Sequence, residues 1–391
     1  MRVLSVCHFL PQPDRPSAGG FVLARLAAMA QLAELRILQP VPHFPLLRPL
    51  PRWARTASHD AAGSRIDHAP MFYLPGALKS LDGRWLERAV MRALPRLGGP
   101  DAFDVLDAHF GYPEGVGCVR VGRRLGRPAF VTVRGLETAV VDDPDTGPQL
   151  IEGLNSAAGI VSVSHALRDL LVSRGVAASR FTVIPNAVDR SLFRPYPQHD
   201  ARRELGLGDA SPLVVSVGNL IELKRHHVLI DAFAGLRASW PRAILAVIGG
   251  GEAEPAYEAR LRSQVVAAGL GTSVRFVGRV PAAGVARWLQ AADVFALATS
   301  REGCCNAILE ALATGRPVVT TPVGDNGQYV RDGLNGYVVP VDDREAMAAA
   351  LHRALARTDW DPDAVSRSLA VGDWPSVARA VLAFFEERRS V

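Results

Sequence analysis

Two glutamates eight residues apart, Glu302 and Glu310, flank what reads as the start of a buried helix. Residues 303–306, Gly-Cys-Cys-Asn, follow the first glutamate and precede an apolar run. The first backbone N–H groups of a helix lack intrahelical partners, so they can bind sugar hydroxyls or phosphate oxygens. The alternative is that the first glutamate is an ordinary acid that stabilises a helix N-terminus.

A second group of residues follows the strand expected at 213–217. There a turn, Gly218-Asn219, leads to two adjacent cations, Lys224 and Arg225. Ligands of open α/β sheets bind at the carboxyl ends of the strands. The cations could therefore neutralise a leaving diphosphate without a metal, and the alternative is a solvated basic loop.

The first half of the chain offers three further candidates, each placed after an expected strand. His109 could hydrogen-bond a sugar hydroxyl or transfer a proton near neutral pH, or it could be a structural histidine. Arg134 could bind phosphate or pair with Glu137. Gly19 and Gly20 could let a phosphate approach a helix start, or they could form a plain flexible turn.

Several other kinds of site are disfavoured. The glycine pattern is neither GxGxxG nor GxxxxGK[ST], which counts against a dinucleotide-dependent dehydrogenase and a P-loop enzyme. The acidic stretches 142–145 and 359–363 contain proline and read as solvated loops. No His/Cys spacing typical of zinc is present, so we expect no metal. The four cysteines show no paired framework, which predicts a reducing cytoplasm.

Short apolar strands alternate with helical segments, which is typical of parallel sheets covered by helices on both faces. Strands are expected at 2–7, 35–39, 105–108, 129–133, 159–163, 181–184, 213–217, 243–248, 274–276, 294–298, 317–320 and 336–339. Helices between them include 20–33, 165–174, 226–238, 257–268, 283–291, 306–313 and 344–356.

A Pro-, Asp- and Gly-rich linker, 186–209, divides the chain. We expect two doubly wound domains that face each other across a crevice, at 1–188 and 189–371. A last helix within 372–391 is expected to pack back on the first domain.

Composition limits the partners. The chain has 391 residues, 48% of them hydrophobic, but no run of about 18 apolar residues that could span a membrane. A net charge of +5 is compatible with phosphorylated ligands, an anionic membrane or nucleic acid. No Lys/Arg run is interleaved with aromatics, which disfavours nucleic acid.

One pattern concerns location. Four arginines recur at intervals of four residues along one expected helix, and aromatic and basic residues occupy 44–55 just upstream. Such a surface suits an anionic bilayer, and the alternative is an ordinary solvated face. The four are Arg84, Arg88, Arg92 and Arg96.

Taken together, these elements resemble the retaining GT-B glycosyltransferases of family four over nearly the whole chain, most strongly over 181–341. The family's E-x7-E signature is matched by 302–321, EGCCNAILEALATGRPVVTT. Its linker motif, close to IPNGVD, appears at 184–189 as IPNAVD. The turn at 247–251, the strand end at 276–278 and the segment 332–336 are also similar.

The resemblance implies an α/β protein of GT-B fold. Glu310 would hold the ribose of a nucleotide donor. Glu302 would hold the donor sugar together with backbone N–H groups of residues 304–306, which are Cys304, Cys305 and Asn306. Lys224 would neutralise the diphosphate, assisted by backbone at Gly19 and Gly20. His109 would contact the transferred sugar.

The resemblance further implies that backbone around Arg279 and Val280 would contact the base. Such enzymes retain the anomeric configuration and need neither a metal nor another cofactor. The sequence departs from the pattern at Asn219, at Arg225 and at Gln328, where relatives carry arginine, glycine and glutamate.

The sequence therefore predicts a metal-independent hexosyltransferase that moves a sugar from a nucleotide-diphosphate sugar to a glycan or lipid-linked acceptor. Arg134-Gly135 matches a subset that acts on bacterial surface polysaccharides. We expect a cytoplasmic protein, peripheral on the inner face of the cell membrane, that binds no nucleic acid. The alternatives are a GT-B-like sugar-nucleotide epimerase and a catalytically degenerate protein that only binds nucleotide sugar.

Overall fold

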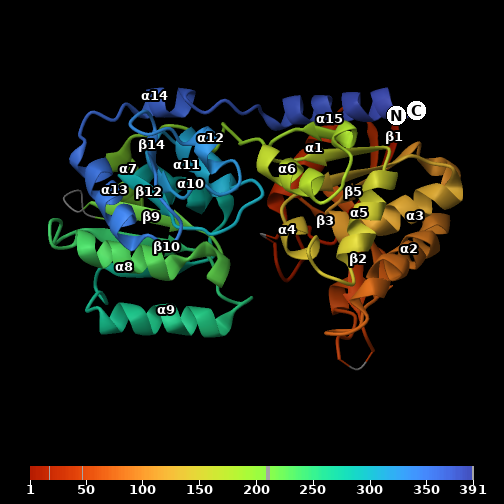
Figure 1. The fold of residues 1–391 in the computed structure, drawn as a ribbon, viewed down its shortest axis with the longest axis horizontal. Coiled ribbons are helices and arrows are strands. Elements are labelled where there is room, and N and C mark those ends of the chain that lie inside the picture. The colour runs from red at the N-terminus through yellow and green to blue at the C-terminus, as the bar shows by residue number, and fades with distance from the viewer. Residues whose placement is uncertain (17, 46, 208–211, 390–391) are drawn as a thin grey trace. The chain divides into compact units, whose positions relative to one another are not determined.

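The computed structural model describes residues 1–16, 18–45, 47–207 and 212–389. The chain forms two compact α/β units, which are described separately (Figure 1). Unit 1 comprises Met1–Asn186 and the segment that begins at Gly372, and unit 2 comprises Ala187–Val371. The first boundary thus lies at the start of the linker expected from the sequence.

Unit 2 is built on a fully parallel sheet in the order β11-β10-β9-β12-β13-β14. The direction of winding reverses between β9 and β12, so the loops after these two strands diverge and leave room for a ligand. The strands are β9 (Leu213–Val217), β10 (Ile244–Ile248), β11 (Val274–Gly278), β12 (Val294–Leu297), β13 (Val318–Thr320) and β14 (Gly336–Val338).

The strands of unit 2 are apolar at consecutive positions because both faces of the sheet are covered. Val214 packs into one core with helices α8 and α13, and its neighbour Val215 packs into a second core with α10 and α11. The helices are α7 (Gln198–Glu204), α8 (His226–Leu236), α9 (Pro255–Ala267), α10 (Ala282–Ala291), α11 (Asn306–Ala313), α12 (Asn326–Tyr329), α13 (Arg344–Ala356) and α14 (Pro362–Arg367).

Unit 1 has a sheet in the order β3-β4-β2-β1-β5-β6-β7-β8, parallel except for the pair β3–β4. Its winding reverses between β1 and β5, so the loops after these strands form the corresponding ligand position. The strands are β1 (Arg2–Val6), β2 (Glu34–His43), β3 (Ser58–Ala61), β4 (Ser64–Phe72), β5 (Val105–His109), β6 (Ala129–Val133), β7 (Gly159–Ser162) and β8 (Phe181–Val183).

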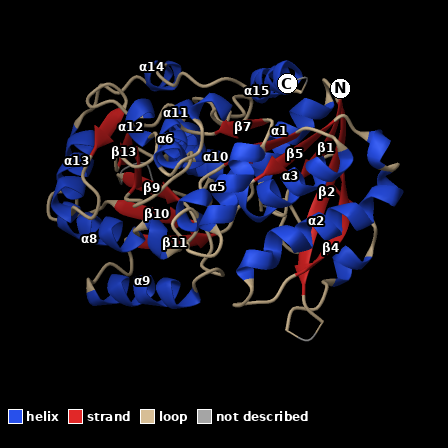
Figure 2. Ribbon diagram, turned by 45° about the vertical axis from the view of Figure 1, so that its right-hand side comes forward, coloured by secondary structure: helices blue, strands red, loops and turns tan. Residues whose placement is uncertain are grey.

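Helices cover both faces of this sheet (Figure 2). Helices α2, α3 and α5 contribute to the main core of the unit, and α1 lies beside the C-terminal helix α15 on the other side. The helices are α1 (Gly20–Ala30), α2 (Asp82–Ala93), α3 (Val116–Leu125), α4 (Glu137–Val140), α5 (Gly147–Ser156), α6 (His165–Ser173) and α15 (Trp374–Arg388).

Helix α15 belongs to unit 1 although it follows unit 2 in the sequence. Its Phe385 ring stacks on Phe130 of β6 with centroids 4.2 Å apart, and Phe384 meets the same ring edge-on. Gly159 makes room for this helix, since a Cβ there would lie 2.6 Å from the Phe384 ring. The helix begins cleanly because the Asp373 side chain accepts a hydrogen bond from the Ser376 N–H.

The twelve strands expected from the sequence are all present, and the helices named there agree with the structure to within a few residues. The hairpin formed by β3 and β4 was not predicted. Its strands carry Asp67, His68 and Pro70, which break the apolar alternation, and its stability comes from pairing β4 with the long strand β2.

Candidate functional site

The carboxyl edge of the unit 2 sheet brings together two of the predicted residues. Lys224 follows β9 and Glu302 follows β12, the two strands at the reversal point, and their Nζ and Oε1 atoms are 2.5 Å apart. The Ser300 N–H donates to the Leu223 carbonyl at 2.9 Å, which holds the two loops together. Burial lowers the pKa of Lys224, but the Glu302 carboxylate outweighs burial and the net pKa is raised. A permanent cation therefore lies at this edge.

Glu310 lies on α11, one of the helices that cover the unit 2 sheet. Among the described residues its carboxylate has no hydrogen-bond or ion-pair partner, and burial raises its pKa to about 8. The side chain is half-buried, and removing a carboxylate without a partner from water is costly, so two neighbouring hydroxyl groups would satisfy both of its oxygens. The arrangement therefore suits a diol such as a ribose.

The start of α11 lies between these two glutamates. Cys305 is its N-cap and is buried, Cys304 is half-buried, and burial raises the pKa of the Cys305 thiol. The backbone of Gly324 approaches the Glu302 carbonyl, where an added Cβ would lie 3.0 Å away. This close approach places the loop after β13 against the same edge. The cysteines are small packing groups here, and a thiolate is disfavoured.

A cavity of about 240 Å³ lies beside this edge, at the ends of β10 and β11. It is lined by the glycine turn 249–251, by Phe276 and by Arg279, whose guanidinium pairs with Glu252 at 3.0 Å. Gly249 is required there because a Cβ would lie 1.9 Å from the Gly218 carbonyl oxygen. Val280, the second residue predicted to contact a base, is half-buried next to the cavity.

The two adjacent cations predicted to act together diverge. Arg225 has a left-handed backbone conformation with φ of 51°, and its guanidinium binds Glu222 and Asp342, both at 3.1 Å. Its side chain therefore lines a different hollow, with His227, and Lys224 alone meets Glu302. Asn219 lies in the turn after β9, and its carbonyl contacts His226.

In unit 1, His109 ends β5 but does not face outward. Its side chain is fully buried, with Nε2 3.0 Å from Asp107 Oδ2 and Nδ1 3.1 Å from Arg134 Nη2. Since arginine only donates, Nδ1 accepts and the Nε2–H donates to the carboxylate. Burial, aided by Arg134 and Arg25, lowers the pKa of His109 to about 4 against the pull of Asp107. The imidazole is therefore neutral, with both nitrogens engaged inside the protein.

The Arg134 guanidinium links His109 to neighbouring groups of unit 1. Its Nη1 donates to Asn186 Oδ1 at 3.0 Å, and its guanidinium lies over the Phe21 ring. The alternative pairing with Glu137 is wrong: the Glu137 carboxylate accepts from backbone N–H groups, including that of Arg134 at 3.0 Å. That carboxylate orders the loop, and the guanidinium stays with His109.

Gly19 and Gly20 have different roles at the start of α1. Gly19 has φ of 60°, and a Cβ there would lie 2.0 Å from the Phe9 carbonyl oxygen. Packing therefore allows only glycine at this position. Gly20 has open space around its Cα. Only the second glycine therefore leaves room for a phosphate.

Sequence reasoning missed His8, which follows β1 at the reversal point of unit 1. Its Nδ1 contacts the buried carboxylate of Glu114, and its side chain is 32% exposed. Burial lowers the pKa of His8, but Glu114 raises it more strongly, so the imidazolium form is favoured. A histidine placed directly after the first strand was the available signal, because strand ends carry ligand-binding groups.

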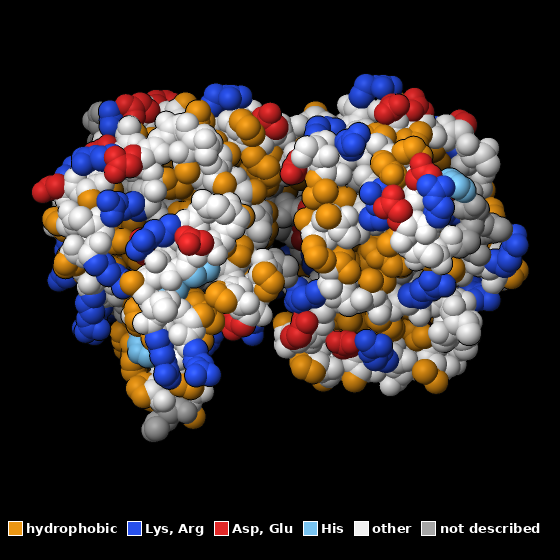
Figure 3. All heavy atoms as spheres, turned by 180° about the vertical axis from the view of Figure 1, so that it is seen from behind, with side chains coloured by type: hydrophobic (Ala, Val, Ile, Leu, Met, Phe, Trp, Pro, Cys, Tyr) orange, Lys and Arg blue, Asp and Glu red, His pale blue; other side chains and the backbone are white. Residues whose placement is uncertain are grey.

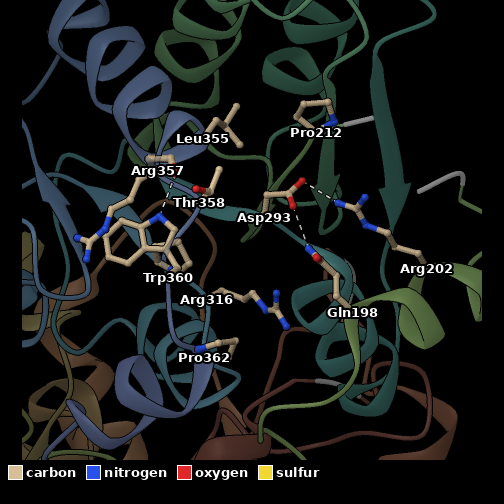
Figure 4. Close-up of a pocket in the computed structure, with 13 residues that line it drawn as sticks. Gln198, Arg202, Pro212, Asp293, Arg316, Leu355, Arg357, Thr358, Trp360 and Pro362 are labelled. Atoms are coloured by element: carbon tan, nitrogen blue, oxygen red, sulfur yellow. Dashed lines mark hydrogen bonds and ion pairs between the residues drawn. The ribbon is translucent and has the colours of Figure 1, made fainter. Parts of the chain in front are cut away.

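A larger cavity of about 400 Å³ lies at the opposite, amino-terminal edge of the unit 2 sheet (Figure 4). Its arginines are used structurally. Arg202 pairs with Asp293 at 2.7 Å and donates to the Ala291 carbonyl, and Arg316 donates to the Ala292 carbonyl. These carbonyls end α10, and cations are stabilising at a helix C-terminus. Arg202 and Arg316 therefore cap the C-terminus of α10. The partial negative charge of a helix C-terminus disfavours an anionic ligand in this cavity.

Two further features bear on the expected partners. Among the described residues, no group of three His, Cys, Asp or Glu side chains is placed to hold a metal ion. No helix in the same part of the chain is both long and apolar enough to cross a membrane.

Known protein families match both units. Residues 33–192 match the model described as Glycosyltransferase Family 4, and residues 211–357 match the model described as Glycosyl transferases group 1. A relative named D-inositol 3-phosphate glycosyltransferase, from a Nocardioides species, is 30% identical over 317 residues, covering 74% of this chain and 68% of the relative. One of the same name from Frankia alni is 28% identical and covers 95% of each chain.

Solved structures show the same fold. HepE of Anabaena, in complex with UDP and glucose, superposes with a TM-score of 0.78 at 19% identity, with 99% of each chain covered. Sucrose-phosphate synthase of Thermosynechococcus elongatus gives 0.76 at 20% identity, again with 99% of each covered. The protein is thus a glycosyltransferase with the GT-B fold. Within that class the chain belongs to glycosyltransferase family 4.

Proposed function

We propose that this glycosyltransferase transfers a hexose from a nucleoside-diphosphate sugar to a glycan or lipid-linked acceptor, with retention of configuration and without a metal. The single observation that carries the proposal is the edge of unit 2 that combines the Lys224–Glu302 pair with the unpartnered Glu310 carboxylate. A cation for the diphosphate and a carboxylate for the ribose are the two groups that such a donor needs. The structural neighbour HepE was solved with UDP-glucose, which makes a uridine donor the first to test.

Charge on the leaving diphosphate is the main obstacle to the reaction. Lys224 stays protonated, and α11 points its N-terminus toward the loop that carries Glu302. A helix N-terminus has a partial positive charge of about half a unit, which adds to that of the lysine. Both stabilise charge that grows as the bond to the sugar breaks, so they act on the transition state.

Retention is supported by the state of the titratable groups at the edge of unit 1. An inverting enzyme needs a general base for the acceptor hydroxyl. His109 has no free nitrogen, Glu137 binds backbone N–H groups, and His8 is held as an imidazolium by Glu114. We therefore infer that the leaving phosphate accepts the proton of the acceptor, on the face from which it departs.

The acceptor is proposed to be a bacterial surface glycan or its lipid-linked precursor, used in the cytoplasm at the inner face of the cell membrane. His8 and Arg134 both follow strands of unit 1 and both carry positive charge. Such an edge suits an acceptor with a phosphate or diphosphate group. Because relatives have the name D-inositol 3-phosphate glycosyltransferase, a phosphorylated polyol belongs among the acceptors to be tested.

The proposal is tested by a thermal-shift panel of uridine, guanosine and adenosine diphosphate sugars. A donor at 100 times its Kd should stabilise the protein by about 2.7 kcal/mol. Lys224→Ala should abolish the shift, and Lys79→Ala, at the only other lysine of the chain, should preserve it. A panel without any shift would contradict donor binding.

Turnover separates the remaining alternatives. The wild-type protein should release nucleoside diphosphate and form a glycoside with the anomeric configuration of the donor. Binding without turnover would favour a protein that only senses the nucleotide sugar. Interconversion of free nucleotide sugars would instead favour an epimerase, and an inverted product would overturn the front-face mechanism.

A further inference from the structure

Helix α2 of unit 1 turns its acids inward. Asp82 and Glu87, the two acidic residues of the helix, are both buried. Glu87 accepts from Arg120 at 2.6 Å and lies 3.4 Å from Arg124, so α3 neutralises it. The outer face of α2 therefore carries no carboxylate.

That outer face, continued by the 3₁₀ turn Leu94–Leu97, carries an arginine stripe, defined as Arg84, Arg88, Arg92 and Arg96. All four side chains are exposed, and within the described residues none has an ion pair or a hydrogen bond. They recur once per turn, so the stripe is about 18 Å long. Exposed arginines without an ion pair also occur elsewhere among the described residues, as Arg242 and Arg344 do, but the stripe sets four of them along one side of a helix. The face of unit 2 that Figure 3 shows has acidic side chains interspersed among the basic ones.

Exposed apolar side chains lie next to the start of this helix. This apolar tip consists of Leu47, Phe72 and Leu78, whose relative exposures are 69%, 39% and 55%. Phe72 packs edge-on against Trp85 of α2 with centroids 4.8 Å apart, and Phe44 of the neighbouring loop packs on Phe72. The tip and the first arginine of the stripe are therefore parts of one surface.

The sequence pattern predicted a basic and aromatic surface here, and the structure changes its composition. Trp53 does not face outward, because its ring packs on His59 and His68. Phe44 is half-buried against Phe72, and residue 46 lies outside the described residues. The aromatic side chains thus support the surface from within, and mainly leucines are left exposed on it.

The apolar tip lies at the carboxyl edge of the sheet. Strand β4 ends at Phe72, and α2 runs back along the sheet from that edge (Figure 2). His8 and Arg134 follow strands of the same parallel sheet, so they lie at the same edge. A partner bound at the tip would therefore lie on the side of unit 1 where the acceptor is proposed to bind.

We propose that the arginine stripe and the apolar tip dock unit 1 on an anionic lipid bilayer. Leucines at the tip enter the interface, and the arginines bind lipid phosphates, for which their forked donors are suited. Nucleic acid fits less well, because single-strand binding uses exposed aromatic rings on which bases stack. The inference rests on the proposed function in one respect: docking would bring the enzyme to the proposed lipid-linked acceptor.

The test is flotation of the full chain with vesicles of phosphatidylcholine alone or mixed equally with phosphatidylglycerol. The protein should float only with the anionic vesicles, and added salt should weaken the binding. Each neutralised arginine should weaken it about fivefold. The quadruple variant R84Q/R88Q/R92Q/R96Q should thus stay in the soluble fraction.

Matched variants keep the test specific. R237Q/R242Q/R275Q/R344Q removes the same charge from four arginines of unit 2 that have no ion pair within the described residues, and it should float as wild type does. Leu78→Asn should reduce binding without harming the fold, because φ at this position is 52° and asparagine tolerates that region.

Three results would overturn the proposal: flotation independent of anionic lipid, equal losses in both quadruple variants, or binding of an RNA homopolymer at the stripe without flotation. The donor-induced thermal shift should persist in all these variants. Loss of this thermal shift would mean that the variant is misfolded or that the proposed donor binding is wrong. Donor binding and membrane docking can therefore fail independently.

Discussion

At the residue scale, the two glutamates of the E-x7-E segment differ in their partners. Glu302 is neutralised by Lys224 at 2.5 Å, whereas Glu310 has no partner among the described residues and its pKa is raised to about 8 by burial. A ribose diol donates two hydrogen bonds, so it binds the ionised carboxylate best. Donor binding should therefore be coupled to the loss of a proton from Glu310.

We predict that donor affinity rises with pH between about pH 6 and about pH 8, by up to tenfold per unit, and then levels off. The sign for stability is opposite: a carboxyl pKa raised by folding makes the unliganded protein lose stability as pH rises from about 4.5 to about 8. Titration calorimetry and urea unfolding would measure the two effects. Glu310→Gln should remove both, and a pH dependence that survives this substitution would refute the assignment.

His109 is predicted to act as a positioning residue. Its neutral ring holds Arg134 through Nδ1, so His109→Ala should lower kcat while leaving the donor KM nearly unchanged. Because its pKa is lowered to about 4, the pH profile of kcat should contain no His109 ionisation near neutrality. A kinetic pKa near 6.5 that disappears in His109→Asn would show instead that the ring exchanges protons with the substrate.

At the element scale, α15 is the part whose position is least evident from the order of the chain. It ends the sequence yet completes unit 1, and aromatic stacking of Phe385 on Phe130 holds it there. Buried aromatic pairs stabilise by area and by geometry. The stability of unit 1 should therefore depend on a segment that follows unit 2.

We predict that Phe385→Ala lowers the free energy of unfolding of unit 1 by about 3 to 5 kcal/mol, because it leaves a cavity beside β6. Arg379→Ala, on the exposed side of the same helix, should change it by less than about 0.5 kcal/mol. Denaturant unfolding of both variants is the measurement. Equal effects would mean that the aromatic contact does not hold the helix.

At the scale of the whole molecule, each unit has its own sheet and its own hydrophobic core. Lys224, Glu302 and Glu310 all belong to unit 2, and Arg134 and His109 belong to unit 1. Separate cores favour separate unfolding transitions. The proposed donor should therefore stabilise one unit preferentially.

We predict two transitions in scanning calorimetry, of which a saturating donor raises only one. Phe385→Ala should lower the other transition and leave the donor-sensitive one in place. A single transition, or an equal shift of both by donor, would show that the two units unfold as one body.

The sequence by itself determined most of the elements and the strand ends that carry the candidate groups, but not the hairpin formed by β3 and β4. Predominantly apolar runs such as 213–217 and 294–297 form strands that are covered on both faces, and the ligand-binding groups follow them. The motif around Glu302 and Glu310 could also be recognised from one short stretch of the sequence.

Only the tertiary structure decided which side chains meet. His109 turns inward onto Asp107, Arg225 turns away from Lys224, and Glu114 reaches His8 across 106 residues. The physical reason is that a strand end fixes where a residue lies, but backbone conformation and the neighbouring elements fix where its side chain points. The φ of 51° at Arg225 and the buried acid beneath His109 are not encoded in any single stretch of the chain.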